Sequence, residues 1–500
     1  MTHLFGGVGP IVVAGFGVLL VLGYLASVAI YRLYFHPLAK LPGPRLYAVT
    51  SLPFLVRDKI LGTWVMSTTE LHAKYGRMVR FAPDRVSVDG SIGWSDIYQR
   101  RPNLPEFDKD IRTYQVGRLG LLPALRDDHL RQRRTVAHAF SVTALKEQET
   151  YVQTHLDFFI GRMHEFAAKD ADVDISNWLN YLTFDIVGDL ALGEPFGCMA
   201  NGGYHPFVSM IFDTAKANAM GNFMDNFKFV SPLVKLMGKR ELRRNMAIIE
   251  MAAATTEKRI ALGPDARKDF MTYLLRKTKD GEGLTHPELL TNSRVLIVAG
   301  SETTATALCG LIFYLSRTPQ AYRRLVEEIR SSFTSEDQIT MQTLEGLPYL
   351  NACLEEILRI YPPAADTPPR ISPGAEVGGY YIPEGTVVSI YQWATHHNPD
   401  NFVNPLTFAP ERWLPRSNPF YESIYDKDNK AAFRSFAVGP RDCVGKNLAY
   451  SEMRLVISRL LWNFDVTLVP GQDDWMKRQK VFLLIEKDDL FAKLKPVKRS

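Results

Sequence analysis

One cysteine lies in the stretch FAVGPRDCVG, residues 436–445, bracketed by glycines and followed by an amphipathic segment. A cysteine binds a metal as its thiolate, which nearby hydrogen-bond donors and positive charge stabilise. Gly439 and Gly445 allow backbone N–H groups to approach the sulfur. The pattern of residues 448–464 predicts a helix whose N-terminus faces Cys443. A lone buried cysteine is more often an inert small hydrophobe, but this context favours a metal-binding thiolate.

The stretch matches F-x-x-G-x-R-x-C-x-G, the haem-binding loop of the cytochrome P-450 family, at every fixed position. The resemblance implies that Cys443 is the thiolate ligand of the iron of haem b. It also implies that Arg441, a planar and permanently charged donor, pairs with a haem propionate, and that Phe436 packs beside the sulfur. The chain is most similar to microsomal, filamentous-fungal members of secondary metabolism, such as trichothecene hydroxylases.

Composition and pattern indicate one large catalytic domain. Of the 500 residues, 46% are hydrophobic, enough for a sizeable core, and no linker or repeat divides the chain after residue 50. Helical periodicity dominates residues 125–359, whereas alternating runs at 377–388 and 480–485 predict short strands. We therefore expect a mainly α fold with small β-sheets, the cytochrome P-450 fold, over residues 47–500.

Charge and cysteine usage exclude two classes of protein. The net charge of +5 is spread without a basic stripe, so nothing predicts nucleic-acid binding. Four cysteines without C-x-x-C spacing indicate a reducing compartment rather than a disulfide scaffold.

Residues 1–31 predict a single membrane-spanning anchor. The segment from Ile11 to Ile30 is uncharged and long enough to cross a bilayer core as a helix. A cleaved signal peptide is the alternative, but no clear small-residue cleavage site precedes Arg32. Basic residues follow the span and none precedes it, which places the catalytic domain in the cytosol. A basic, proline-rich hinge, residues 32–46, comes next, and the fungal resemblance predicts the endoplasmic-reticulum membrane.

The segment AGSETT, residues 299–304, is unusual inside a long apolar helical pattern. Glycine weakens a helix, and hydroxyl groups can divert helix carbonyls and open a space for water or dioxygen. A polar cap on a helix surface is the bland alternative. The segment matches the oxygen-activation motif of the family, which implies that Thr303 orders a proton-donating water and that Glu302 relays protons from solvent.

Two further matches predict structural and haem-binding side chains. Glu356 and Arg359, one helical turn apart, resemble the E-x-x-R motif, and Arg412 in FAPERW resembles the arginine that completes a buried Glu-Arg-Arg network. The family positions that contact haem propionates are occupied by three residues: His129, where tryptophan is commoner, Arg133 and Arg370.

The resemblance implies a haem-thiolate monooxygenase that inserts one atom of O2 into a lipophilic small molecule. The chain has no G-x-G-x-x-G nucleotide motif, so we expect electrons from NADPH-cytochrome P-450 reductase, with cytochrome b5 as a second candidate. We expect a terpenoid, polyketide or alkaloid substrate, contacted by residues 104–122, 204–236, 297–304 and 364–367. Three alternatives stay open: a reductase-independent haem-thiolate isomerase or dehydratase, xenobiotic or fatty-acid oxidation, and a haem carrier or sensor.

Overall fold

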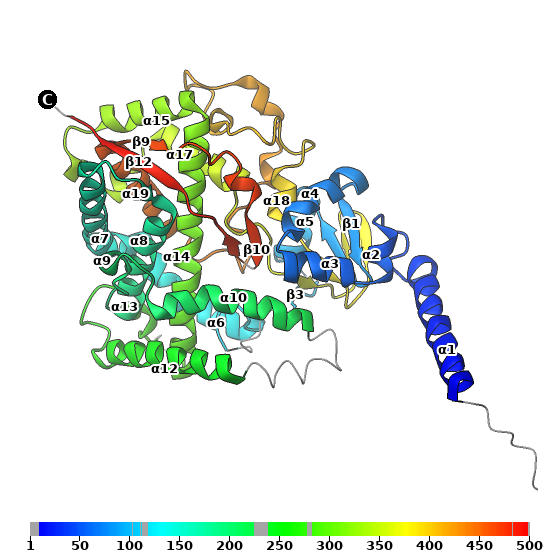
Figure 1. The fold of residues 1–500 in the computed structure, drawn as a ribbon. Coiled ribbons are helices and arrows are strands. Elements are labelled where there is room, and N and C mark those ends of the chain that lie inside the picture. Colours follow the sequence, from blue (N-terminus) through cyan, green and yellow to red (C-terminus); the bar gives the residue numbers. More distant parts are fainter. Residues whose placement is uncertain are drawn as a thin grey trace, which may run out of the picture.

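The computed structural model describes residues 10–102, 104–110, 112, 119–224, 239–277, 283–482 and 484–498. Parts of two expected substrate-contacting segments, 104–122 and 204–236, therefore lie outside the described residues. The chain forms a helical body, a smaller sheet-containing lobe and one projecting N-terminal helix (Figure 1). This confirms the predicted fold class, mainly α with small β-sheets.

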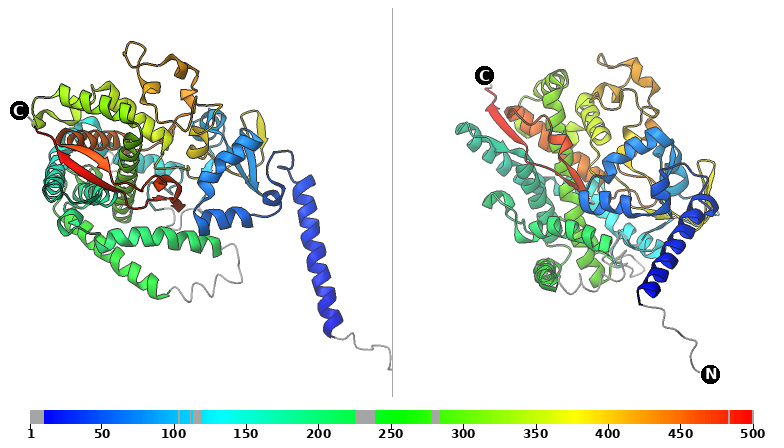
Figure 2. Two further views of the ribbon diagram at one scale, coloured as in Figure 1. Left: turned by 45° about the horizontal axis from the view of Figure 1, so that its top comes forward. Right: turned by 45° about the vertical axis from the view of Figure 1, so that its right-hand side comes forward.

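The N-terminal helix α1 (Pro10–Ile30) continues into one turn of π-helix, Tyr31–Phe35. It points away from the rest of the molecule in every view (Figures 1 and 2). Residues Ile11–Phe35 have a mean hydropathy of 2.4 and none of their apolar window is buried. At 1.5 Å per residue, α1 is about 30 Å long, the thickness of a bilayer core. An exposed apolar helix of this length is what a membrane anchor requires.

The helical body is built from long helices joined mostly by short connections. They are α6 (Arg126–Ala137), α7 (Val142–Ala168), α8 (Ile175–Leu192), α10 (Pro206–Met224), α12 (Lys239–Ala261), α14 (His286–Arg317), α15 (Pro319–Ser332), α17 (Pro348–Ile360) and α19 (Lys446–Asn463). The shorter helices are α2 (Arg45–Val49), α3 (Leu52–Leu55), α4 (Trp64–Tyr75), α5 (Gly90–Gly93), α9 (Cys198–Asn201), α13 (Phe270–Leu274), α16 (Met341–Leu344) and α18 (Gln392–His396).

The strands form small sheets. The lobe nearest α1 holds a sheet of order β1-β2-β8-β5-β3: Met78–Ala82, Arg85–Val88, Val387–Ser389, Arg370–Ile371 and Asp108–Lys109. The others are β4-β12-β9 (Val173–Asp174, Phe491–Pro496, Phe464–Leu468), β6-β7 (Ala375–Val377, Tyr380–Ile382) and β10-β11 (Lys480–Phe482, Leu484–Glu486). The alternating runs predicted near 377–388 and 480–485 thus form strands, and the β1-β2 pair is an addition.

Helix α14 runs through the middle of the helical body (Figure 1) and packs on α8, α17 and α19. Its N-terminus carries a reciprocal capping box between Thr285 and Glu288. Gly310 lies where a Cβ atom would meet the ring of Tyr361 at 2.2 Å, so only glycine permits this close packing. Although α14 is long and apolar enough to cross a membrane, 72% of its apolar window is buried, as in a core helix.

Candidate functional site

The cysteine loop has a backbone that requires glycine. Gly439 has φ +85°, and a Cβ atom there would lie 2.2 Å from the carbonyl oxygen of Tyr98. Ala437 also adopts a positive φ, 58°. The Cys443 N–H closes the loop by donating to the Phe436 carbonyl at 2.9 Å. The turn therefore fixes Cys443 three residues before α19.

The Cys443 side chain has an exposed surface although protein surrounds most of it. Its surface is exposed, whereas Cys198, Cys309 and Cys353 are buried. Burial is nevertheless the main cause that raises the pKa of the Cys443 thiol, so the sulfur lies deep in the protein yet open on one side. The Gly445 N–H, Arg133 and Lys446 act in the opposite direction and favour the thiolate. This is the arrangement of amide and positive charge that the glycines predicted.

Two predicted haem-binding residues brace the same loop. Arg133, on α6, donates to the Asp442 carbonyl and forms a 2.7 Å ion pair with the Asp442 carboxylate. The Phe436 ring packs against Tyr450 of α19, with ring centroids 5.2 Å apart. Both side chains thus hold the cysteine loop against neighbouring helices.

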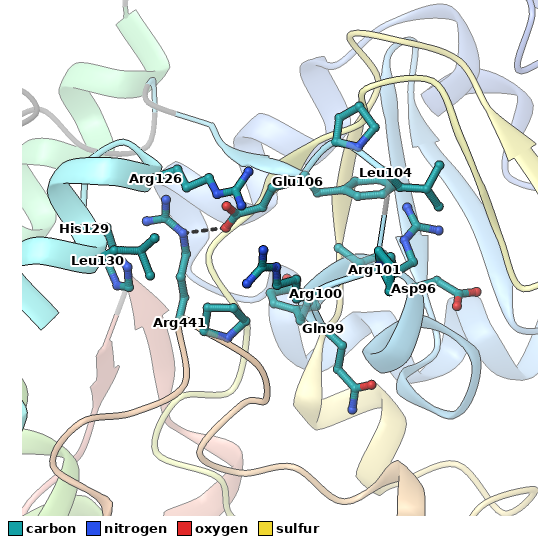
Figure 3. A pocket seen from close by; sticks show the side chains of 16 residues that line it. Asp96, Gln99, Arg100, Arg101, Leu104, Glu106, Arg126, His129, Leu130 and Arg441 are labelled. Carbon is teal, nitrogen blue, oxygen red and sulfur yellow. Dashed lines mark hydrogen bonds and ion pairs between the residues drawn. The ribbon is translucent and has the colours of Figure 1, made fainter. Parts of the chain in front are cut away.

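The remaining predicted propionate contacts gather in a positively charged region. Arg441 is almost fully buried and pairs with Glu106 at 2.8 Å, at the wall of a cavity of about 490 Å³ that His129 also lines (Figure 3). Arg370 is buried on β5, with its guanidinium over the Tyr98 ring. The structure therefore brings residues from α6, β5 and the cysteine loop to one place.

Burial and the positive charge of this region lower the pKa of two of its own side chains, His129 and Lys109. The pKa of His129 falls to about 3, so its imidazole is neutral at physiological pH. Burial is the first cause, and four positive side chains are the others: Arg441, Lys109, Arg133 and Arg370. The pKa of Lys109 is held well below its ordinary value by burial, then by Arg370 and Arg441. An acidic group placed here would relieve this repulsion.

These residues fit a haem. A thiol with an exposed surface that protein otherwise surrounds suits an iron ligand, and the positive region suits the two propionates of the porphyrin. Within the described residues, no group of three or more His, Cys, Asp or Glu side chains forms a conventional metal site. One thiolate plus a region for anionic groups is the donor set of a haem rather than of a bare ion.

The polar cluster on α14 has one face open and one face buried. Ala299 is exposed although it lies in the middle of a core helix, and Thr303, one turn further on, is half-buried. The Thr303 hydroxyl donates to the Ala299 carbonyl at 2.7 Å, and the Ser301 hydroxyl to the Ile297 carbonyl at 2.6 Å. The hydroxyl groups therefore bond back to helix carbonyls, as the sequence predicted.

Glu302 lies on a different face of α14 from Thr303. Its side chain is buried and forms an ion pair with Lys487, while the Thr306 hydroxyl donates to Oε1 at 3.2 Å. The structure contains no hydrogen bond between the described Glu302 and Thr303 side chains. The predicted relay residues are neighbours in sequence, but the carboxylate is held away from the threonine.

Glu356, Arg359 and Arg412 come together, fully buried, as one network. Arg359 donates to both Glu356 oxygens, at 2.7 and 2.9 Å, and Arg412 approaches Glu356 within 2.9 Å. Further donors are the Ala409 N–H and the Trp413 indole, at 2.9 and 2.8 Å from Glu356. Arg359 also binds the carbonyls of His396 and Pro405. The network ties α17 to the segment before the cysteine loop.

Sequence reasoning missed the partners of these residues. Lys487 is 185 residues from Glu302, and Asp428, which pairs with Arg412 at 2.5 Å, lies in no motif. No motif in the sequence pointed to Glu106 or Lys109 as members of the site. The role of Asp442 could have been predicted, because a carboxylate beside a metal-binding cysteine suggests that an arginine pairs with it.

Comparisons with known proteins show the family to which the chain is similar. The family model for cytochrome P450 matches residues 41–492. The chain is 39% identical to the trichothecene C-4 hydroxylase of Trichoderma arundinaceum, covering 94% of this chain and 95% of that protein. It is 38% identical to the cytochrome P450 monooxygenase astJ of Aspergillus oryzae (93% and 94%) and 35% identical to the averantin hydroxylase of Dothistroma septosporum (97% and 91%).

Proposed function

The chain belongs to the cytochrome P450 family and is a P450 monooxygenase, and we propose that it oxidises a lipophilic intermediate of fungal secondary-metabolite biosynthesis, by default through hydroxylation. Two of its relatives are named for the hydroxylation of a trichothecene and of averantin. The observation that carries the proposal is the open Cys443 thiol in a positively charged surrounding. A terpenoid, polyketide or alkaloid intermediate fits this class.

Haem b is the cofactor that we propose for the site. Cys443 would hold the iron, Phe436 and Arg133 would brace the cysteine loop, and the region around Arg441, His129 and Arg370 would receive the propionates. When bound, a thiolate-ligated haem supplies the activation of dioxygen. Arg441 would then bind a propionate either in place of Glu106, its present ion-pair partner, or together with Glu106.

The residues of α14 supply proton control. The Thr303 hydroxyl lies on the open face, where it can exchange its hydrogen bond to Ala299 for one to a water molecule. Glu302 is the acid that we assign to the relay, since a carboxylate and a hydroxyl are suited to proton transfer near neutral pH. Its present ion pair with Lys487 means that it must change partner before it can serve Thr303.

Electrons come from a partner protein in this proposal. NADPH-cytochrome P-450 reductase is the expected donor, and cytochrome b5 is a second one. Lys446, the exposed first residue of α19, lies three residues after Cys443 and suits an acidic partner on that face. Loss of reductase coupling at high salt would support this assignment.

The exposed apolar helix α1 supports a membrane location. We propose the endoplasmic-reticulum membrane, with α1 as a single-pass anchor and the catalytic domain in the cytosol. Basic residues follow α1, in agreement with the positive-inside rule. A lipophilic substrate that partitions into the bilayer would reach such an enzyme from the membrane.

A reductase-independent isomerase or dehydratase is the second candidate, because it would use the same cysteine loop. The Thr303 and Glu302 motif favours the monooxygenase, since rearrangement of a peroxide needs no proton relay from solvent.

The test is mass spectrometry of lipophilic extracts incubated with microsomes that carry this chain and the reductase. The Cys443→Ala variant is the control. We expect an NADPH-dependent product heavier by one oxygen atom, absent with the control variant. A loss of two hydrogens would indicate desaturation or coupling instead, and equal product without NADPH would refute the monooxygenase in favour of the isomerase.

A further inference from the structure

The Glu302 carboxylate has one oxygen with hydrogen-bond partners and one buried oxygen without a partner in the described residues. Oε1 accepts from Lys487 Nζ and, at 3.2 Å, from the Thr306 hydroxyl, while Lys487 Nζ also donates to Thr306 Oγ1 at 2.9 Å. Both charged side chains are at most 3% exposed. Oε2 is buried and has no hydrogen-bond partner in the described part of the chain. A closed triangle of three side chains therefore fixes one oxygen and leaves the other buried without a partner in the described residues.

Helix geometry explains why this triangle matters. Residues i and i+1 do not face each other on a helix, whereas residues i and i+4 do. Glu302 thus shares a face with Thr306, and Thr303 shares the open face with Ala299. While the triangle is closed, Glu302 is directed to the side of α14 that faces Lys487. Its orientation is set by a residue outside α14.

Lys487 directly follows β11 in the C-terminal hairpin. Successive side chains of a strand point to opposite sides, and the residue before it, Glu486, pairs outward with Lys216 of α10. Figure 1 shows β10 of this hairpin close to α10, and β11 contacts α14. The end of the hairpin thus lies between α10, in an expected substrate-contacting segment, and the acid of α14.

A buried ion pair is costly to break from one side, because the remaining charge loses its counter-ion. Opening the pair therefore requires a replacement partner for each charge. We propose that Lys487 is a positioning residue for proton delivery: it sets when the Glu302 carboxylate can leave its buried side and serve Thr303. This inference rests on the proposed function, since Glu302 needs control only in an oxygen-activating enzyme.

The consequence concerns the fate of the electrons. A coupled turnover converts substrate R–H, O2, NADPH and H⁺ into R–OH, H2O and NADP⁺. Without timely protons, the same two electrons and two protons leave as hydrogen peroxide: O2, NADPH and H⁺ give H2O2 and NADP⁺. Without Lys487 the buried Glu302 carboxyl has no counter-ion and keeps its proton on its buried side, so it no longer delivers protons in time. Loss of Lys487 should therefore change the product ratio rather than stop NADPH consumption.

The experiment compares Lys487→Met with two milder variants and a control. Lys487→Arg keeps the positive charge, and Thr306→Val removes only the bridging hydroxyl. Lys493→Met is the control, because Lys493 is exposed and pairs with Asp170 at the surface. For each haem-loaded protein, substrate product, peroxide and NADPH consumed are measured, and infrared spectra of the resting protein record protonated carboxylic acids.

We expect Lys487→Met to form about tenfold less product per NADPH, with peroxide accounting for the remaining NADPH. This effect is smaller than the roughly 10²-fold or greater loss expected when a proton-transfer group itself is removed. Thr306→Val should lose about two- to fivefold, and Lys487→Arg and Lys493→Met should stay near wild type. The resting spectrum of Lys487→Met should gain a carboxylic-acid band that is absent from Lys487→Met/Glu302→Gln.

Wild-type product ratios in both Lys487→Met and Thr306→Val would overturn the proposal. If Lys487→Met does not fold, wild-type coupling in Thr306→Val together with an unchanged infrared spectrum would do so. The infrared comparison needs no turnover, so it reads the Lys487–Glu302 pair even if the wild-type protein proves to be an isomerase. Failure of the proposed function would instead appear as wild-type product formed without NADPH.

Discussion

Glu452 gives a sharp prediction about stability and pH. It lies on α19, fully buried, and neither carboxylate oxygen has a hydrogen-bond partner in the described residues. Burial raises its pKa from 4.5 to about 8, opposed only in part by the hydroxyl of Thr304. That hydroxyl donates to the Gly300 carbonyl at 3.2 Å. The side chain is thus a neutral carboxylic acid at physiological pH.

The sign of the effect follows from linkage. Because the folded pKa lies above the unfolded one, the folded protein keeps a proton that the unfolded chain releases. The stabilisation is complete below about pH 4.5 and is lost as the pH rises towards about 8. At about 1.36 kcal/mol per pKa unit, the loss is about 3 kcal/mol at pH 7 and about 4 kcal/mol at pH 8.

Glu452→Gln isolates this effect, since the amide has the same shape and does not titrate. Urea unfolding of both proteins from pH 4.5 to 8, followed by circular dichroism, gives the difference in free energy of unfolding. We expect that difference to shift in favour of glutamine by about 4 kcal/mol across the range. A difference that is constant with pH would refute the reasoning, because it would show that folded and unfolded protein release the Glu452 proton at the same pH.

The buried network, the cysteine loop and α1 each give one further prediction. Arg412→Met leaves the buried Asp428 carboxylate without its ion-pair partner and removes one of the two arginines from Glu356, so it should cost about 3–5 kcal/mol in urea unfolding. Arg416→Met, at an exposed pair, should cost much less; equal costs would contradict a buried network. Gly439→Ala places a Cβ atom 2.2 Å from a carbonyl and should prevent haem incorporation, read by absorbance. Gly471→Ala is the control, with a similar φ of +88° but no atom within 4 Å, and it should keep its haem; equal loss would point to backbone strain alone. Removing α1 and the residues before it should release the protein from microsomal membranes with its haem spectrum intact, and full retention in the membrane would show a second attachment.

The sequence predicted those parts of the site that are local. Gly439 and Cys443 lie in the same ten-residue loop, so their spacing in the sequence already determines how close they are in the structure. The same is true of Glu356 and Arg359, one helical turn apart. The sequence also predicted helix α14 correctly, because its apolar residues recur with helical spacing over a long segment.

What the sequence could not give is the pairing of distant charges. Lys487 is one of many lysines, and only the path of the C-terminal hairpin brings it to Glu302. The partner of Arg441 is likewise a matter of tertiary packing, since Glu106 comes from a loop 335 residues away. Such contacts depend on how elements pack, which no short motif encodes.

The most direct test of the central claim is the absorbance spectrum of the reduced protein treated with carbon monoxide. The account predicts the long-wavelength band of thiolate-ligated haem in the wild type and in Cys198→Ala, where a buried cysteine is changed. It predicts that Cys443→His binds haem but loses this band, because an imidazole replaces the thiolate. The thiolate band in Cys443→His, or its absence from the haem-loaded wild type, would contradict the assignment of Cys443 as the iron ligand.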